Sequence, residues 1–189
     1  MMRIISGTAK GKKIIMPIDK NTRPLKDMVK QSIFNIIEHS DLLNFNIKEC
    51  YILDLFSGVG SFGIEAISRG ATKVIFFEKH KPAIELLQKN ISNFSFENKA
   101  VIYYENIFEE NCFKKLEYKF NIVFLDPPFK EKNIDVILQN FYNSKLFHSK
   151  TLIIIHRHKK TIDNFIKNFK VKREEIYGSS KVIFGFFTS

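Results

Sequence analysis

The sequence lacks the features that would assign it to several specialised classes of protein. No apolar run approaches the ~18–20 residues that a membrane-spanning helix needs, and residues 1–14 lack the apolar core of a signal peptide. Cys50 and Cys112 are the only cysteines and lie in no CxxC or Cys/His spacing, which gives no reason to expect a zinc site or disulfide framework. There is no tryptophan, internal repeat or low-complexity linker. We therefore expect a cytoplasmic protein that needs no metal.

Positive charge is concentrated at the two ends of the chain. The 189 residues carry a net charge of +10. Residues 1–31 hold eight lysines and arginines against two aspartates, and residues 156–189 hold eight against three acidic residues. Basic ends around a nearly neutral centre suit a catalytic core flanked by surfaces for a polyanion such as nucleic acid. Solvated lysines that only keep the surface soluble would give the same pattern.

The order of apolar patterns predicts an α/β fold. From residue 51 onward, short apolar runs alternate with helical patterns, which is typical of βαβ units. The expected strands are 51–55, 73–78, 100–104, 121–125 and 152–155, followed by a hairpin of 171–177 and 182–187. The expected helices are 61–69, 82–93, 108–116, 133–142 and 161–169. These elements predict a mainly parallel seven-stranded sheet that ends in an antiparallel hairpin.

The first 50 residues differ from the rest and predict a small N-terminal extension on a core that spans residues 51–189. Residues 3–5 and 12–16 resemble the arms of a hairpin, and an amphipathic helix is expected at about residues 26–39. We therefore expect two functional parts in a chain of single-domain length.

A glycine-rich stretch after the first expected strand predicts a site for an adenosine-bearing cofactor. It contains the string GxGxxG at residues 58–63, which alone would favour a dinucleotide. Asp54, at the end of the strand, favours a cofactor that carries an amino acid, because its carboxylate can accept a hydrogen bond from a cationic amino group and would repel a pyrophosphate. Glu78 ends the second strand, 20 residues after Gly58, where an acid binds ribose hydroxyls in Rossmann-like folds.

The segment Asp126-Pro127-Pro128-Phe129 directly follows an apolar strand and predicts a site for an exocyclic amine. Two successive prolines fix φ and lack N–H donors, so they favour a rigid turn with available carbonyls. The Asp126 carboxylate and the Pro127 carbonyl would accept the two hydrogens of the amine. Phe129 offers a face on which a base can stack. A turn whose prolines only stop the strand is the alternative interpretation.

Together these residues resemble the class I S-adenosylmethionine-dependent methyltransferases, a Rossmann-like fold, and among them the amino-methyltransferases with a D/N-P-P-Y/F/W motif. The resemblance extends over the whole chain to the bacterial RsmD family, which methylates N2 of a guanine in 16S rRNA. The stretches that carry it are Arg3-Ile-Ile-Ser-Gly7, Gly11-Lys-Lys-Ile14, Thr22-Arg-Pro24, Phe34-Asn35, Asp54-Leu-Phe-Ser-Gly58, Ser68-Arg-Gly-Ala71, Asp126-Pro-Pro128 and Tyr177-Gly178.

The resemblance implies S-adenosylmethionine as cofactor, S-adenosylhomocysteine as product and 16S rRNA as partner. Asn106 is expected to meet the adenine amino group, with Ile107 beside the ring. The full set of expected cofactor-binding residues is Asp54, Phe56, Gly58, Gly60, Glu78, Lys79, Asn106, Ile107 and Asp126. The chain departs from the family pattern with Phe129 for the usual Tyr, Asn106 for the usual Asp, and Met28 and Gln31 where Arg and Glu are expected.

The extension is expected to contact RNA phosphates through five cations and to cover the cofactor with its helix; alternatively, it only shields the sheet. The expected RNA-binding residues are Arg3, Lys10, Lys12, Lys13 and Arg23. His156 and His158 are expected to form a polar rim. We expect a monomer that acts on a small-subunit particle. Two other hypotheses remain open: amino-methylation of adenine or cytosine in DNA, and a non-catalytic RNA-binding protein of ribosome assembly.

Overall fold

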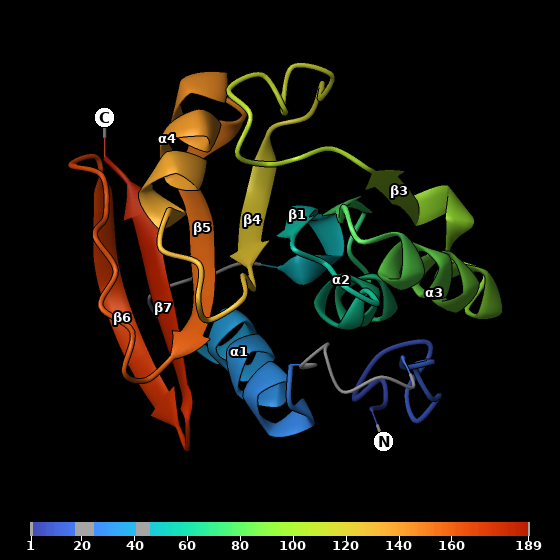
Figure 1. Ribbon diagram of the computed structural model, residues 1–189. Coiled ribbons are helices and arrows are strands. Elements are labelled where there is room, and N and C mark those ends of the chain that lie inside the picture. The colour runs from blue at the N-terminus through green and yellow to red at the C-terminus, as the bar shows by residue number, and fades with distance from the viewer. Residues whose placement is uncertain (1, 18–24, 41–45, 189) are drawn as a thin grey trace.

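A computed structural model of the protein describes residues 2–17, 25–40 and 46–188. It contains a seven-stranded sheet with the strand order β3-β2-β1-β4-β5-β7-β6 (Figure 1). The strands are β1 Tyr51–Leu55, β2 Lys73–Phe77, β3 Ala100–Tyr103, β4 Phe120–Leu125, β5 Phe147–His158, β6 Phe169–Tyr177 and β7 Ser180–Phe187. Strands β1 to β5 pair in parallel, whereas β7 pairs antiparallel with β5 and β6. The predicted α/β fold with its terminal hairpin is therefore confirmed.

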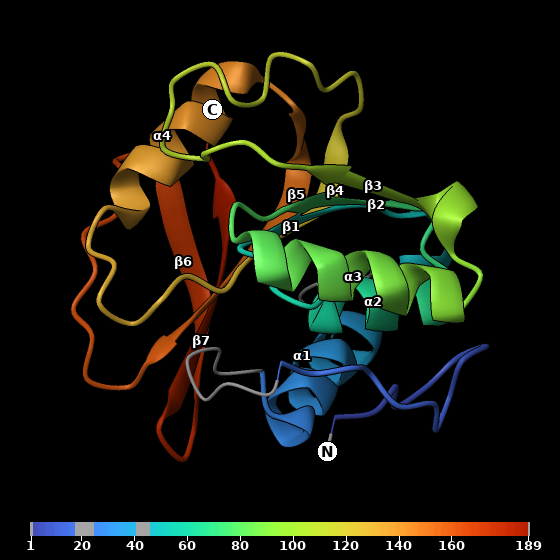
Figure 2. The same cartoon turned by 45° about the vertical axis from the view of Figure 1, so that its right-hand side comes forward.

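Helices cover both faces of the sheet. Helices α1 Asp27–His39, α2 Ser61–Ser68 and α3 Lys81–Asn93 lie on one face, and α4 Ile134–Ser144 lies on the other (Figure 2). Two short 3₁₀ helices, η1 Ile47–Glu49 and η2 Glu97–Lys99, precede β1 and β3. None of the described helices is both long and apolar enough to cross a lipid bilayer.

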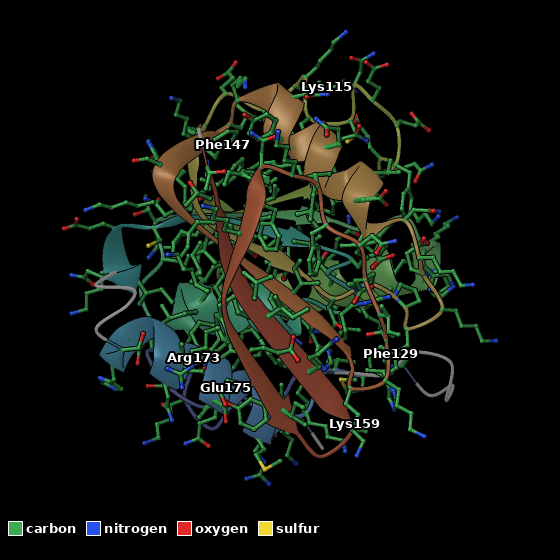
Figure 3. All side chains as sticks on the ribbon, turned by 90° about the vertical axis from the view of Figure 1, so that its left-hand side faces the viewer. Lys115, Phe129, Phe147, Lys159, Arg173 and Glu175 are labelled. Carbon is green, nitrogen blue, oxygen red and sulfur yellow. The ribbon has the colours of Figure 1, made fainter. Side chains whose placement is uncertain are left out.

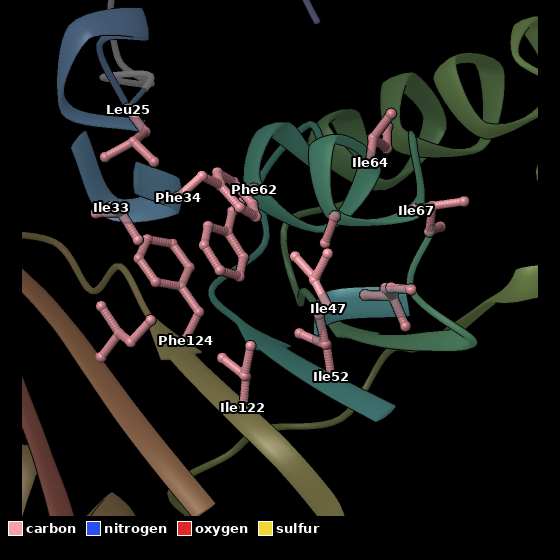
Figure 4. Close-up of a cluster of buried hydrophobic side chains, with 14 of the residues drawn as sticks. Leu25, Ile33, Phe34, Ile47, Ile52, Phe62, Ile64, Ile67, Ile122 and Phe124 are labelled. Atoms are coloured by element: carbon pink, nitrogen blue, oxygen red, sulfur yellow. The ribbon is translucent and has the colours of Figure 1, made fainter. Parts of the chain in front are cut away.

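The alternation of side chains along the central strands produces two hydrophobic cores. Ile122 and Phe124 of β4 face the side of α1 to α3, whereas Val123 and Leu125 face the side of α4. On the first face, the rings of Phe34, Phe62 and Phe124 form a continuous stack, with centroids 4.9 and 4.0 Å apart (Figure 4). This stack fixes α1 and α2 against the end of β4, immediately before Asp126.

The N-terminal extension packs onto the same face as α2 and α3. The two arms of the predicted hairpin pair through one β-bridge, between Arg3 and Lys13, and through backbone hydrogen bonds between residues 2–4 and 11–14. Lys30 of α1 is fully buried, and its ammonium donates to the carbonyl of Arg3 at 2.8 Å and lies 3.5 Å from the Glu65 carboxylate. Glu65 in turn accepts from the backbone N–H groups of Ile5 and Ser6. These contacts tie the extension to α2 through a buried polar network.

Two predicted helices are wrong. Residues 108–116 form consecutive turns, because the Asn140 side chain lies within 3.2–3.4 Å of the carbonyls of residues 107–109, which a helix would use internally. Residues 161–168 form a loop, in which the Asp163 carboxylate is held by Arg157 rather than placed on a helix surface. Strand β5 is also longer than the predicted 152–155, because its ends pair with Phe120 and with β7.

Candidate functional site

A pocket of about 670 Å³ lies at the carboxyl ends of the parallel strands. The strand order reverses between β1 and β4, which is where open α/β sheets bind ligands. The volume of the pocket falls within the usual range of about 300–1,000 Å³ for small-molecule sites. Ten of the predicted site residues line it: Asp54, Phe56, Gly58, Glu78, Lys79, Asn106, Ile107, Asp126, Pro127 and Phe129. Met16 and Leu25 add an apolar edge from the N-terminal extension.

Gly60, the remaining predicted cofactor residue, does not line the pocket. It is the N-cap of α2 with φ of +85°, a conformation that L side chains rarely adopt. A Cβ atom at this position would lie 2.4 Å from the Leu87 side chain. Gly60 therefore has a structural role: it allows the turn of the glycine loop and the close packing of this loop on α3, and it does not contact the pocket.

The Asp54 carboxylate is buried, with a residue exposure of 1%. One oxygen accepts a hydrogen bond from the N–H of Gly63, at 2.9 Å. Burial raises the pKa of Asp54 well above its usual value, and the nearby charges of Asp126 and Glu78 raise it further. A cationic group in the pocket would relieve this accumulation of negative charge, so the site suits a positively charged ligand.

The Glu78 carboxylate accepts hydrogen bonds from two backbone segments, the glycine loop and the residues that follow Glu78. One carboxylate oxygen accepts from the N–H of Gly58 at 2.8 Å, and the other accepts from the N–H groups of Lys79 and His80, both at 2.9 Å. Each oxygen can accept more than one hydrogen bond. Glu78 therefore fixes the glycine loop and can still receive ribose hydroxyls.

A second part of the pocket wall is apolar. Phe56 has φ of +59°, a strained value for a residue other than glycine, and its ring makes an edge contact with Phe108 at 6.0 Å between centroids. Ile107 is buried beside them. The Asn106 side-chain oxygen accepts a long hydrogen bond, at 3.4 Å, from the N–H of Phe108. This wall offers apolar contact to a planar ring and one amide to its polar edge.

Asp126 is held by a histidine that we did not predict as a site residue. Nδ1 of His156 lies 2.7 Å from Oδ1 of Asp126. Since an ionised carboxylate can only accept, His156 donates this hydrogen bond. The His156 side chain is only 6% exposed, and within the described chain its Nε2 atom is buried without a hydrogen-bond partner. The ring thus fixes one oxygen of Asp126 and leaves the other available to the pocket.

The sequence carried a signal for this pair. Asp126 and His156 each follow directly after an apolar run, NIVFL in β4 and LIII in β5. Leu125 and Ile155 are register partners in these adjacent parallel strands, so the next residues along are neighbours too. The sequence shows both strand ends but not that β4 lies beside β5, so the contact of His156 with Asp126 follows only from the strand order.

Arg157 fixes the turn after Asp126 from the opposite face of the sheet. Its guanidinium is buried, pairs with the Asp163 carboxylate and donates to the carbonyls of Pro128 and Glu131. The Pro128 carbonyl also accepts from the N–H of Glu131 at 2.8 Å. Because Pro128 is committed to the loop in this way, Pro127 is the proline whose carbonyl can serve a ligand.

Phe129 stands at the mouth of the pocket between two histidines. Its ring makes edge contacts with His156 and His158, at 5.7 and 5.3 Å between centroids. Phe129 lines the pocket and is only half-buried, so it lies at the solvent-facing edge of the pocket. Phe129 is therefore placed to contact a flat group that enters beside Asp126.

The predicted RNA-binding cations lie apart from the pocket. Arg3, Lys10, Lys12 and Lys13 are all exposed, and none of them lines it. Lys10 follows a turn whose N–H groups bind Ser68, at the far end of α2 from the pocket and about 10 Å along the helix. Arg23 lies outside the described residues.

The described residues contain no cluster of three or more His, Cys, Asp or Glu side chains that could hold a metal ion. The pocket instead combines four features. The buried Asp54 carboxylate can receive a cation, Glu78 can receive hydroxyl groups, one wall is apolar, and the Asp126 carboxylate is oriented by His156. Among the described residues it supplies no activated cysteine, since Cys50 and Cys112 are both buried and burial raises their pKa values to about 11 and about 12. The site therefore suits chemistry by alignment of two bound groups.

Comparisons with known proteins identify the family of the chain. The family described as conserved hypothetical protein 95 matches residues 2–186. Ribosomal RNA small subunit methyltransferase D of Buchnera aphidicola subsp. Baizongia pistaciae is 33% identical over 177 residues, which cover 92% of this chain and 86% of the relative. The protein of the same name in Escherichia coli strain K12 is 26% identical over 181 residues, covering 94% and 85%.

A solved structure has the same fold. A conserved hypothetical protein of Streptococcus pyogenes superposes with a TM-score of 0.72 at 28% identity, covering 85% of this chain and 96% of that one. The full-length family match and the relatives confirm the resemblance found in the sequence. The chain therefore belongs to the family described as conserved hypothetical protein 95, the RsmD family of rRNA methyltransferases.

Proposed function

We propose that this protein transfers a methyl group from S-adenosylmethionine to the exocyclic N2 of a guanine in 16S rRNA of the small ribosomal subunit. The observation that carries the proposal is the Asp126 carboxylate, which directly follows β4, lines the pocket and is oriented by His156 at 2.7 Å. The names of the relatives support rRNA of the small subunit as the substrate.

The pocket fits the cofactor at the level of its charge and shape. S-adenosylmethionine, when bound, supplies a methyl group on a cationic sulfonium, together with an amino acid and an adenosine. Asp54, whose pKa burial and the neighbouring carboxylates raise, would gain from the nearby positive charge of the amino acid. Glu78 would receive the ribose hydroxyls, and Asn106 and Ile107 would contact the adenine. Phe56 and Lys79 complete this side of the pocket.

Asp126 and Pro127 would orient the amine that is methylated. The free oxygen of Asp126 would accept one hydrogen of the amine and the Pro127 carbonyl the other, so that the nitrogen lone pair is directed into the pocket. Phe129 would stack on the base and hold its plane. This alignment in a site shielded from water supplies most of the rate, and the acceptance of hydrogen bonds by Asp126 helps the amine lose a proton as it becomes cationic.

The two parts of the chain take different roles in this proposal. Residues 51–189 form the catalytic part, and residues 1–50 form an extension that closes one edge of the cofactor pocket through Met16 and Leu25. We further propose that the protein acts as a monomer on a small-subunit particle and without a metal. A ribosomal substrate is also the reason that we expect it to work in the cytoplasm.

The proposal is tested by methyl transfer from tritiated cofactor. Small subunits prepared from cells that lack the enzyme should become labelled in 16S rRNA, and Asp126→Ala should abolish the label while it retains cofactor binding in calorimetry. Label in duplex DNA in preference to RNA would replace the proposal by DNA amino-methylation. RNA binding without cofactor binding would replace it by a non-catalytic role in ribosome assembly.

A further inference from the structure

The loop between β5 and β6 is built against the turn that carries Asp126. Arg157 pairs with Asp163 of this loop at 2.8 Å and donates to the Pro128 carbonyl at 3.2 Å, so one guanidinium joins the two segments. Both side chains of the ion pair are only 2% exposed. His158, where the loop leaves β5, contacts the ring of Phe129. The loop therefore lies against the Asp126 turn and beside Phe129, which lines the pocket.

Further contacts fix the backbone of this loop. The Lys181 ammonium donates to the Thr161 carbonyl at 2.8 Å, and the N–H of Lys159 donates to the Ser179 carbonyl at 2.9 Å. The N–H of Thr161 donates to the His158 carbonyl at 2.9 Å, which closes a turn. The loop is thus held by β7 on one side and by Arg157 on the other.

Ile162 is the most exposed large apolar residue in the described chain, at 95%. A single exposed apolar side chain is ordinary on a protein surface. Here, however, the residues on both sides are fixed, Thr161 by Lys181 and Asp163 by Arg157. The β-branched side chain is itself stiff. The fold therefore presents Ile162 to solvent on a supported backbone beside the pocket.

The surroundings of Ile162 are basic. Lys159 and Lys160 precede it in the loop, and Lys130 and Lys132 follow Phe129 in the adjacent turn; all four are exposed. Asp163 is neutralised by Arg157, which leaves Glu131 as the acidic residue among these lysines. In Figure 3, Phe129 and Lys159 lie at the same end of the sheet, far from Phe147 and Lys115. Part of the basic charge at the C-terminal end of the sequence is thus gathered at the pocket mouth.

We infer that the exposed residues Lys130, Lys159, Lys160 and Ile162, here called the mouth ridge, form an RNA-contacting surface that delivers the target base to the pocket. This inference rests on the proposed function. The lysines would neutralise phosphates next to the target nucleotide. A base in a helix must leave its stack to reach a buried acceptor, and proteins that open stacks insert apolar side chains into the gap. Ile162 is positioned and supported for this contact.

Charge reversal tests the lysines of the mouth ridge. The double variant Lys159→Glu and Lys160→Glu should raise KM for undermethylated small subunits by about tenfold or more, and the slope of log affinity for an rRNA fragment against log salt should fall by about 1.5. The matched control is Lys170→Glu with Lys172→Glu. These two exposed lysines lie on β6, at the level of the Ile153–Gly185 pairing and away from the pocket mouth. The control should change KM by less than about threefold.

A second pair of variants tests Ile162. Ile162→Ser should lower kcat for structured rRNA by about fivefold or more at unchanged thermal stability, because the side chain is solvated in the free protein but fills the opened stack in the complex. Ile176→Ser, at a 59% exposed position on β6, should leave kcat unchanged.

The outcomes separate this inference from the proposed function. If the wild-type protein methylates no RNA, the proposed function fails, and the mouth ridge is then judged by RNA binding alone. If the wild type methylates rRNA but the mouth-ridge variants equal their controls, the inference is overturned and the proposed function stands. Loss of binding to a protein partner of the particle, with naked rRNA bound normally, would also overturn it.

Discussion

At the scale of single residues, Asp54 is a buried carboxylate whose charged form is costly in the free protein. Its carboxylate is 1% exposed, has one hydrogen bond from Gly63 and lies near the charges of Asp126 and Glu78. Such a residue is expensive to bury in the free protein and useful when a cation arrives. The electrostatic cost of burying Asp54 therefore indicates a role in binding, because a residue that served only stability would not be a buried carboxylate beside two other acids.

Asp54→Asn should separate stability from binding. Because burial raises the pKa of Asp54 in the folded protein above its unfolded value, ionised Asp54 costs stability as pH rises through the folded pKa. The variant should therefore melt at the same or a higher temperature than the wild type near neutral pH, while its cofactor Kd rises about tenfold or more. Melting curves and calorimetry across pH 5–9 check both. A large fall in melting temperature with unchanged cofactor affinity would make Asp54 a structural residue.

His156 should affect turnover more than cofactor binding. In His156→Leu the Asp126 carboxylate loses the donor to Oδ1 and can rotate, so kcat should fall about tenfold or more while the cofactor Kd stays within about twofold. His156→Asn places an amide N–H near the position of Nδ1 and should recover part of the rate. Steady-state kinetics on both variants measure the difference. Equal rates for Asn and Leu would show that the hydrogen bond has no role in positioning.

At the scale of elements, the carboxyl end of β5 supports the whole substrate side of the site. His156 contacts Asp126 on one face, and Arg157 holds the Pro128 carbonyl and Asp163 on the other. Both residues lie in the part of β5 that pairing with β7 extends to His158, beyond the predicted end at residue 155. The carboxyl end of β5 therefore sets the geometry of both the turn after Asp126 and the loop between β5 and β6.

Arg157→Met should lower the free energy of unfolding by about 3–5 kcal/mol, because it leaves the Asp163 carboxylate buried without its cation. The double variant Arg157→Met with Asp163→Leu removes both charges and should recover part of this loss. Urea unfolding of the two single variants and the double variant measures the coupling. Additive effects of the two substitutions would show that the pair does not act as a unit.

The elements were predictable where local pattern and tertiary contacts agree. Strand β1 has the predicted bounds, and α3 begins within one residue of the predicted start, because Pro82 at the first turn and the apolar spacing both favour it. The helices predicted at 108–116 and 161–169 failed because side chains outside each segment, Asn140 and Arg157, bind the backbone or a side chain there. No local pattern contains that information.

The residues of the candidate site were likewise predictable only where a local sequence motif brings them together. Residues that a motif brings together, such as Asp54 with Gly58 or Asp126 with Phe129, could be predicted from the sequence and line one pocket. His156 and Arg157 depend on the pairing of β4 with β5, which the sequence alone leaves open. The exposed Ile162 could be recognised only once the loop was known to be fixed.

At the scale of the whole molecule, the extension and the catalytic part share one core. Val29, Ile33 and Phe34 of α1 pack in the same cluster as Ile52 and Phe124 of the sheet. The buried contact of Lys30 with the Arg3 carbonyl ties the chain start into this cluster. The extension should therefore fold and unfold together with the sheet.

Cofactor binding should stabilise both parts together. At a cofactor concentration 100 times Kd, the free energy of unfolding should rise by about 2.7 kcal/mol in a single transition. Because Met16 and Leu25 line the pocket, amide exchange should slow in residues 2–17 and 25–39 as well as around β1 and β4. Hydrogen exchange with and without cofactor measures this. Two separate unfolding transitions, with protection confined to residues 51–188, would contradict the shared core.

The identity of the methylated nucleoside tests the central claim most directly. After reaction with undermethylated small subunits, digestion of the 16S rRNA and mass spectrometry of the nucleosides should reveal N2-methylguanosine at a single position. The product should be absent with Asp126→Ala. N6-methyladenosine, N4-methylcytosine or methylation of a ring carbon or ribose oxygen in its place would contradict the account.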